Sequence, residues 1–185
     1  IKYAGIKNLA KSPHSTNLKH LDLWGNMIGD MGLKVLSESS FIKGLEVLKL
    51  WKNEIGDDSL ELMVKSSNFK QLKTLMLNDN MVTPVGAGYL ANPDVFPQLE
   101  TLNLFRNSIG DEGALAFSLS KPFVNLKSFY VGENNLSDNG AIALIKSNSF
   151  PNLEVLDMVK NHLGEETSIA AFMSRKKNKI QIIIR

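Results

Sequence analysis

Apolar residues recur along this chain with a spacing that changes within each of a series of equal segments. Leu21 and Leu23 stand two positions apart, which matches the alternation of a β-strand. Residues 113–119 and 140–145 instead have the apolar spacing of a helix. The pattern therefore predicts short strands that alternate with helices along the whole chain.

The alternation repeats with a fixed 27-residue period, which is the step from Asn26 to Asn53. Each copy reads L-x-x-L-x-L-x-x-N, with apolar replacements at Phe129, Val131 and Met158. The closing asparagine occurs in six consecutive copies without an insertion, at Asn26, Asn53, Asn80, Asn107, Asn134 and Asn161. A regular period of this length is typical of a solenoid, in which each repeat is one supersecondary unit stacked on its neighbours.

The residues after each asparagine resemble one class of leucine-rich repeat. After Asn107, residues 108–114 read SIGDEGA and lead into a helical stretch. This N-x-I-G-D-x-G pattern is similar to that of ribonuclease-inhibitor-like leucine-rich-repeat proteins, with departures at Pro84, Ser59 and Thr167. The resemblance covers essentially the whole chain. It implies an α/β fold, a curved right-handed leucine-rich-repeat solenoid with a parallel sheet on the concave face and helices on the convex face.

The predicted organisation is a single leucine-rich-repeat domain over residues 1–185, with about seven repeats that are partial at both ends. Ile1 aligns with Ile28, inside a repeat, and one further period predicts the last strand, with Ile180, Ile183 and Arg185 aligned to Leu153, Leu156 and Met158. Neither end resembles the polar cap that a solenoid needs, and residues 180–184 form an apolar edge. We therefore expect either a fragment of a longer protein or an end that a partner covers.

Three sets of residues at this period are predicted to be structural. The amide of each ladder asparagine can donate and accept at once, so it can satisfy backbone groups of its own and the next repeat. The aspartates at the helix starts are suited to capping those helices, namely Asp30, Asp57, Asp111 and Asp138. An aromatic spine is predicted inside the returning turns, at Phe69, Phe96, Phe123 and Phe150.

Composition and charge fit a folded protein that binds neither nucleic acid nor membrane. The formal net charge is only +2, whereas nucleic-acid binding usually shows as a strong basic excess. No apolar run approaches the length of a membrane helix, which needs about 18 residues or more. The chain has no cysteine, which excludes disulfides, cysteine zinc sites and a cysteine nucleophile. The lack of cysteine favours a reducing compartment such as the cytoplasm, or a bacterial source, and leaves secretion as an effector open.

The motif search predicts no enzyme, no cofactor and no metal site. His14, His20 and His162 lie far apart and lack metal-ligand spacing. A dinucleotide-like G-x-G-x-x-A match at residues 86–91 is explained by the repeat itself. The basic run at residues 175–179 is most simply a solvated turn, and a nuclear import signal or a phosphate contact is the alternative.

The outward strand positions are predicted to form columns on the concave face, and one column is aromatic. It holds Trp24, Trp51 and Phe105, although the fold requires no aromatic residue there. Exposed aromatic and arginine side chains are enriched in binding hot spots. The predicted partner-binding residues are therefore Trp24, Trp51, Phe105, Tyr130, Asp22, Lys49, Arg106 and Asp157. The alternative is that the large side chains only shield the sheet or pack on one another.

Three functions stay open, and the first is the one predicted. It is a protein-interaction module of a receptor or bacterial effector, because the mixed charges of the concave face favour a protein over a polyanion. The second follows from the resemblance to Ran GTPase-activating relatives, with Arg106 as the only concave arginine and so the only charge-stabilising finger. The third is a structural spacer between other domains.

Overall fold

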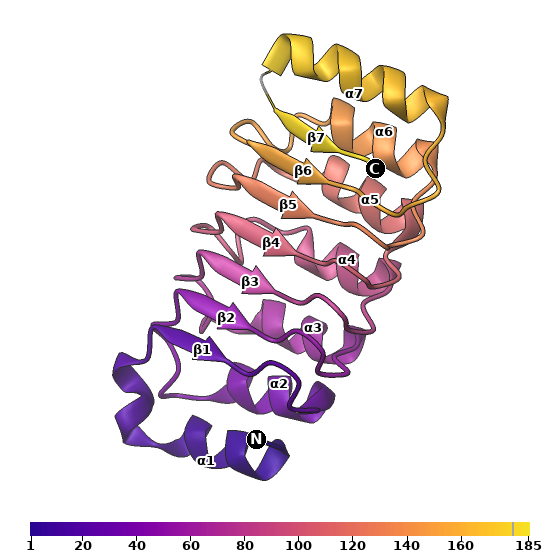
Figure 1. The fold of residues 1–185 in the computed structure, drawn as a ribbon. Coiled ribbons are helices and arrows are strands. Elements are labelled where there is room, and N and C mark those ends of the chain that lie inside the picture. The colour runs from indigo at the N-terminus through magenta and orange to yellow at the C-terminus, as the bar shows by residue number, and fades with distance from the viewer. Residues whose placement is uncertain (179) are drawn as a thin grey trace.

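The chain forms a solenoid in which one parallel sheet is backed by a row of helices, as the computed structural model shows (Figure 1). The structure describes residues 1–178 and 180–185, without the side chains of residues 175–178, so the predicted basic run lies outside the described residues. The strands of the described chain are β1 His20–Asp22, β2 Val47–Lys49, β3 Thr74–Met76, β4 Thr101–Asn103, β5 Ser128–Tyr130, β6 Val155–Asp157 and β7 Gln181–Ile183.

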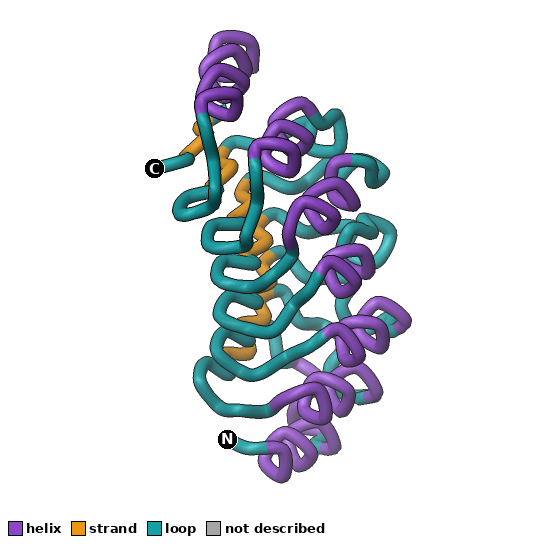
Figure 2. The backbone as a smooth tube through the Cα atoms, turned by 90° about the vertical axis from the view of Figure 1, so that its right-hand side faces the viewer, coloured by secondary structure: helices purple, strands orange, loops and turns teal. Residues whose placement is uncertain are grey.

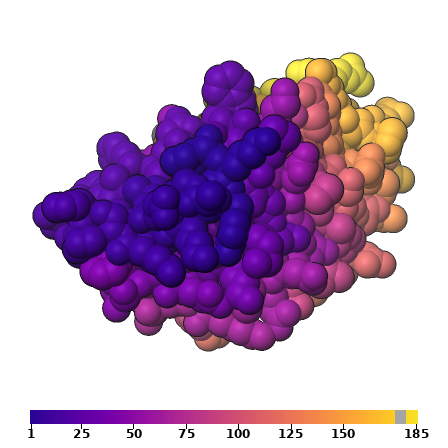
Figure 3. Space-filling view, turned by 90° about the horizontal axis from the view of Figure 1, so that it is seen from below, coloured from indigo at the N-terminus to yellow at the C-terminus, as the bar shows by residue number. Residues whose placement is uncertain are grey.

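The helices lie on the convex side of the sheet, where each packs against the next in chain order (Figure 2). Their bounds are α1 Tyr3–Lys11, α2 Gly29–Glu38, α3 Asp57–Lys65, α4 Pro84–Leu90, α5 Gly110–Ser118, α6 Asp138–Lys146 and α7 Glu165–Asn178, with a short 3₁₀ helix at Pro13–Asn17. Seen from below, residues of the first repeat lie in front (Figure 3). The predicted α/β leucine-rich-repeat solenoid is confirmed.

The strands are all parallel and follow one another in chain order from β1 to β7. Leu48 pairs with Leu21 and with Leu75, and the same step separates paired residues at every junction from β1 to β6. The middle residue of each strand is buried and its two neighbours face outward. This register produces the outward columns of the concave face.

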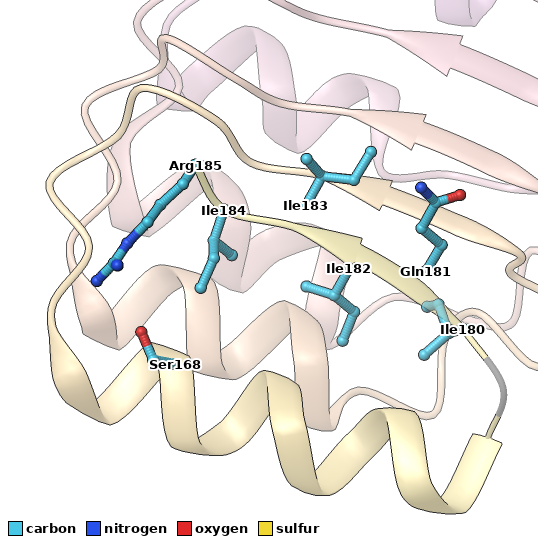
Figure 4. A pocket seen from close by; sticks show the side chains of 7 residues that line it. All are labelled: Ser168, Ile180, Gln181, Ile182, Ile183, Ile184 and Arg185. Carbon is cyan, nitrogen blue, oxygen red and sulfur yellow. The ribbon is translucent and has the colours of Figure 1, made fainter.

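The seventh strand is offset from the predicted alignment by one residue. Val155 pairs with Gln181 and Leu156 pairs with Ile182, so this step is one position shorter than the others. The alignment of Ile183 with Leu156 is therefore wrong. A slip of one residue exchanges the two faces of a strand, and the predicted register would have turned Arg185 inward. In the structure Ile182 is fully buried and points toward α7, whereas Ile183 lies on the opposite face (Figure 4).

The asparagine ladder joins neighbouring repeats through backbone hydrogen bonds. Asn107 accepts the N–H of Val82 on its Oδ1 at 2.9 Å. Its Nδ2 donates to the carbonyl oxygens of Leu77 and Leu104, both at 2.9 Å. The same side-chain contacts to the preceding strand recur at the other inner members, Asn53, Asn80, Asn134 and Asn161. Backbone groups thereby satisfy the amides of these asparagines.

The aromatic spine fills the interior on the side where the chain returns from helix to strand. All four of its phenylalanines are buried, and Ile42 continues the row. The rings of Phe123 and Phe150 lie 6.2 Å apart, and Phe117 and Phe129 pack beside them. The burial that the regular spacing predicts for this spine is therefore confirmed.

The aspartates at the helix starts accept hydrogen bonds from the following repeat, so the prediction that they cap their own helices is wrong. Asp30 lies in the first turn of α2, but its Oδ1 accepts the N–H of Gly56 at 2.8 Å, just before α3. The residue before α2 is Ile28, which makes no side-chain cap. Each aspartate is the first or second residue of its own helix, past the N-cap position, and its carboxylate instead accepts N–H groups at the start of the next helix.

Candidate functional site on the concave face

Trp24 and Trp51 stack on each other at one end of the concave face. They follow β1 and β2 in equivalent turns, and their ring centroids lie 4.8 Å apart with an angle of 21° between the planes. This distance equals the spacing of neighbouring strands. Trp24 stays 56% exposed, so a large aromatic surface faces solvent even after the pair has formed.

Phe105 holds the same column two repeats further along and lies against Gly132. A Cβ atom on Gly132 would stand 2.5 Å from the Phe105 ring, so only glycine leaves room for the ring in this position. The guanidinium carbon of Arg106 lies 5.7 Å from the centroid of the same ring, within cation–π range. The glycine and the arginine together fix the ring on the concave face.

Asn78 occupies this column between Trp51 and Phe105, and it is the polar exception there. Its side chain is buried, with 8% of the residue exposed. The Nδ2 group donates to Asp79 Oδ2 at 3.3 Å, whereas the Oδ1 atom has no hydrogen-bond partner within the described chain. A buried carbonyl oxygen without a donor costs about 1–3 kcal/mol. The protein therefore carries an unsatisfied acceptor in the middle of its concave face.

The polar residues of the neighbouring column support the turns that carry the aromatic residues. Asp22 accepts the N–H of Trp24 at 3.1 Å, and Asn103 accepts the N–H of Phe105 at 2.8 Å. Asp157 makes the same contact with Val159 at 3.0 Å. Lys49 lies 3.5 Å from Asp22. These side chains hold the turns, and Tyr130 lies half-buried in the same column.

A ladder of alternating charges runs along the edge where the strands end. Arg106 donates to Asp79 at 2.8 Å on one side and to Glu133 at 2.8 Å on the other, and Lys160 also pairs with Glu133. The hydrogen bond from Arg106 is the main reason that the pKa of Glu133 falls to about 2. The hydrogen bonds that Arg106 donates to Glu133 and Asp79 raise its own pKa. Both flanks of the guanidinium are thus occupied by carboxylates.

A second ladder runs along the edge where the strands begin. Here Glu46 pairs with Lys73 at 2.8 Å and with Lys19 at 3.3 Å, and Lys127 pairs with Glu100 at 2.8 Å. The hydrogen bond from Lys73 is the largest cause that lowers the pKa of Glu46. Charges on both edges of the concave face therefore neutralise one another.

The family model described as "Leucine Rich repeat" matches residues 14–37, 97–118 and 124–144. These stretches contain the strand and helix units described above. At these residues the chain carries leucine-rich repeats. Leucine-rich-repeat proteins are typically modules that bind other proteins. The model does not distinguish the ribonuclease-inhibitor-like subtype, which stays a prediction.

Among solved structures, a chain of the "Crystal structure of Rad7 and Elc1 complex in yeast" is similar at 15% identity with a TM-score of 0.44. The comparison covers 100% of this leucine-rich-repeat chain and 60% of that chain. No curated protein matches the sequence.

The leucine-rich-repeat fold gathers the predicted binding residues into two groups. Trp24, Trp51, Asp22 and Lys49 lie together over β1 and β2, and Phe105, Tyr130 and Arg106 lie over β4 and β5, with Asp157 on β6 beside Tyr130. Neither the role of Asn78 nor the edge ladder that contains Arg106 was predicted from the sequence. The signal for the ladder was the alternation of charge from repeat to repeat, at positions 79, 106, 133 and 160. Nothing in the sequence marks the missing partner of Asn78.

Among the described residues, no three histidine, aspartate or glutamate side chains lie together in a way that suits a metal ion. None of the described helices has the length and apolar character to cross a bilayer.

Proposed function

We propose that this chain is a protein-interaction module whose partner lies on the concave face over Trp24, Trp51, Phe105 and Tyr130. The observation that carries the proposal is the stacked tryptophan pair, which leaves Trp24 more than half exposed. Exposed tryptophans are costly in solution and are strongly enriched in binding hot spots. The leucine-rich repeats support the same class of function.

The column itself shows that the fold does not need these aromatic residues. Gly132 and Val159 hold equivalent positions later in the same column, and the strands beside them keep the same register. A small side chain is therefore compatible with the architecture. The tryptophans add an exposed apolar surface that stacking alone leaves uncovered, and a partner that covers it would bury that surface.

The charged members of the predicted set contribute to the site indirectly. Asp22 and Asp157 hold turns, Lys49 pairs with Asp22, and Arg106 is bound by two carboxylates. An arginine that acts as a finger on a nucleotide must leave such partners and break two ion pairs. No observation favours the GTPase-activating alternative over a binding module, and the spacer alternative gives no role to the exposed tryptophans.

The test is capture of partners from a cell lysate on the immobilised chain, followed by mass spectrometry, with two variants run beside the parent. The first is the triple variant Trp24→Ala/Trp51→Ala/Phe105→Ala. The second is a matched control on the convex helices, Leu115→Ala/Ile169→Ala/Met173→Ala, which also removes exposed apolar side chains. Far-ultraviolet circular dichroism checks that both variants keep the helical content of the parent.

We expect a protein that the parent and the convex control retain and that the concave variant loses. Loss by the convex control alone would move the site to the helices. Equal capture by all three chains would contradict a concave site, and a parent that captures nothing would favour the spacer.

A further inference from the structure

The strands in the middle of the concave face carry no charged side chain at their outward positions, and the charged residues of the turns after them, Asp79, Arg106 and Glu133, belong to the edge ladder. On β3, β4, β5 and the turns directly after them, those positions hold Thr74, Met76, Asn78, Thr101, Asn103, Phe105, Ser128, Tyr130 and Gly132. We call this set the central concave field. The charged residues of the concave columns, Asp22, Lys49 and Asp157, belong to strands on either side of it.

The charges that border the central concave field are already paired. Arg106 is bound by Asp79 and Glu133 on the edge after the strands, and Lys73 and Lys127 are bound by Glu46 and Glu100 on the edge before them. A charged partner would have to break these pairs or bury its own charge without a counterion, which is costly. The field therefore selects against a strongly charged partner, including the phosphates of a nucleic acid.

Asn78 adds a specific hydrogen-bonding requirement. Its orientation is set by the contact of Nδ2 with Asp79, because the reversed amide would place Oδ1 against a carboxylate. The equivalent polar atom of Asn103 accepts a backbone N–H of its own repeat, whereas Asn78 Oδ1 has no donor within the described chain. An N–H from outside the chain would satisfy it. Since Oδ1 exposes less than 1 Å² of surface, a neighbouring side chain must turn to admit that donor.

We propose that the central concave field recognises an uncharged, extended polypeptide segment that donates one N–H to Asn78 Oδ1 and packs apolar side chains against Phe105 and Tyr130. The inference rests on the proposed function and names the chemistry of the partner. A polypeptide fits because it supplies N–H donors and apolar side chains together, and the field offers Met76, Phe105 and Tyr130 beside the hydroxyls of Thr74, Thr101 and Ser128.

The first test titrates the chain with three pools of capped nine-residue peptides. All pools share randomised Leu, Val, Pro, Ser, Thr, Asn and Gln positions, and they differ by carrying no charge, two acidic residues or two basic residues. Isothermal titration calorimetry measures the binding of each pool without a label. A neutral oligosaccharide pool runs beside the peptides.

We expect the uncharged peptides to bind, with a Kd that changes less than about two-fold between roughly 50 and 500 mM NaCl. Binding by a charged pool alone, or a Kd that rises ten-fold with salt, would overturn the inference. So would binding of the oligosaccharide pool without any peptide, or no binding by any pool.

The second test separates recognition from structure at Asn78. The variant Asn78→Leu removes an unsatisfied acceptor, so we expect its Tm to rise by about 2–4 °C while its affinity for the uncharged peptide pool falls about ten-fold. The matched variant Asn103→Leu removes an acceptor that is in use and should lower the Tm. A lowered Tm for Asn78→Leu, or an unchanged affinity, would overturn the role of Asn78.

The two proposals can fail separately. If no peptide binds but the lysate still yields a protein that the triple concave variant loses, the inference fails and the interaction module stands. If the triple variant also captures that protein unchanged, both fail.

Discussion

Asp111 of one repeat accepts the backbone N–H of Ser137 in the next repeat at 2.8 Å. The same carboxylate accepts the Ser137 hydroxyl and the N–H of Gly140. Three other junctions are built alike, since Asp30 binds Gly56, Asp57 binds Thr83 and Asp138 binds Gly164. An acidic residue at the start of one helix thus satisfies the N-terminus of the following helix and ties the two repeats together.

Asp111→Ala should therefore destabilise the chain by about 1.5–3 kcal/mol, the range for hydrogen bonds to a charged group. Urea unfolding followed by circular dichroism measures this loss. Glu112→Ala is the matched control, because Glu112 lies in the same first turn but is exposed and has no such bond in the described structure. It should change stability by less than about 0.5 kcal/mol. Equal effects of the two substitutions would show that the helix dipole, and not the junction, explains the aspartates.

The backbone conformation at the start of each helix depends on whether the preceding repeat supplies this carboxylate. Where Tyr3 and Pro84 take its place, the glycine at the next junction adopts positive φ, at 58° for Gly29 and 57° for Gly110. The N–H groups of these two glycines donate to the backbone oxygens of Asn53 and Asn134. Where the aspartate is present, the equivalent residue is extended, as at Gly56 with φ −109°.

Gly110→Ala should accordingly cost about 1 kcal/mol, because a left-handed backbone disfavours any residue with a Cβ atom. Gly88→Ala is the opposite case: Gly88 lies inside α4, its φ is not positive, and a Cβ atom there meets nothing within 4 Å. That substitution should stabilise the chain by about 0.5–1 kcal/mol. Thermal unfolding of both variants checks the signs, and a stabilised Gly110→Ala would refute the proposed strain.

The sequence predicts most of the fold because the fixed 27-residue spacing of the strand motif determines which side chains point inward in each repeat. It fails at β7, where the step from the preceding strand is one position shorter. The spacing of apolar residues does not reveal this shorter step. The cost of burying a charge does, because the predicted register turns Arg185 inward, whereas the observed register buries Ile182. Burial of an unpaired charge should have outweighed periodicity.

The candidate site was less predictable than the fold, because its contacts join side chains of different repeats and the pattern within one repeat does not specify them. Taken alone, Arg106 is predicted to be a free arginine of the concave face. In the structure it is bound by Asp79 and Glu133 of the neighbouring repeats. The missing partner of Asn78 depends on three-dimensional packing and has no sequence signature.

Acid should weaken the edge ladder through Glu133. Its pKa in the folded chain is about 2, below the ordinary value of 4.5, so the ionised group stabilises the fold above pH 4.5 and this contribution is lost as the pH falls toward 2. The parent should be more stable than Glu133→Gln at about pH 6, and the difference in Tm should close as the pH falls to about 2. Thermal unfolding at low salt measures the difference. A Tm difference that does not change with pH would mean that the carboxylate charge is not what matters.

Removal of a ladder asparagine should be costly only where its amide is buried. Asn107→Ala leaves the N–H of Val82 and two carbonyl oxygens without their partner, so we expect a loss of about 1–3 kcal/mol. Asn125→Ala removes an exposed side-chain bond to the Pro97 carbonyl oxygen, which water can replace, and should cost less than about 0.5 kcal/mol. Similar losses in urea unfolding would contradict a special role for the buried ladder.

Variants of the stacked tryptophans can tell whether the indole rings only pack on each other or also bind a partner. This requires the free energy of unfolding and partner capture to be measured on the same variants. A double-mutant cycle of Trp24→Ala and Trp51→Ala should give a coupling free energy of about 0.5–1.5 kcal/mol, the range for a stacked aromatic pair. Coupling is expected under either role, so it does not decide between them. Partner capture decides: each single variant should lose partner as well as stability, because each removes part of an exposed aromatic surface. If the single variants show the coupling and still retain the partner of the parent, the indole rings pack on one another and the binding surface lies elsewhere.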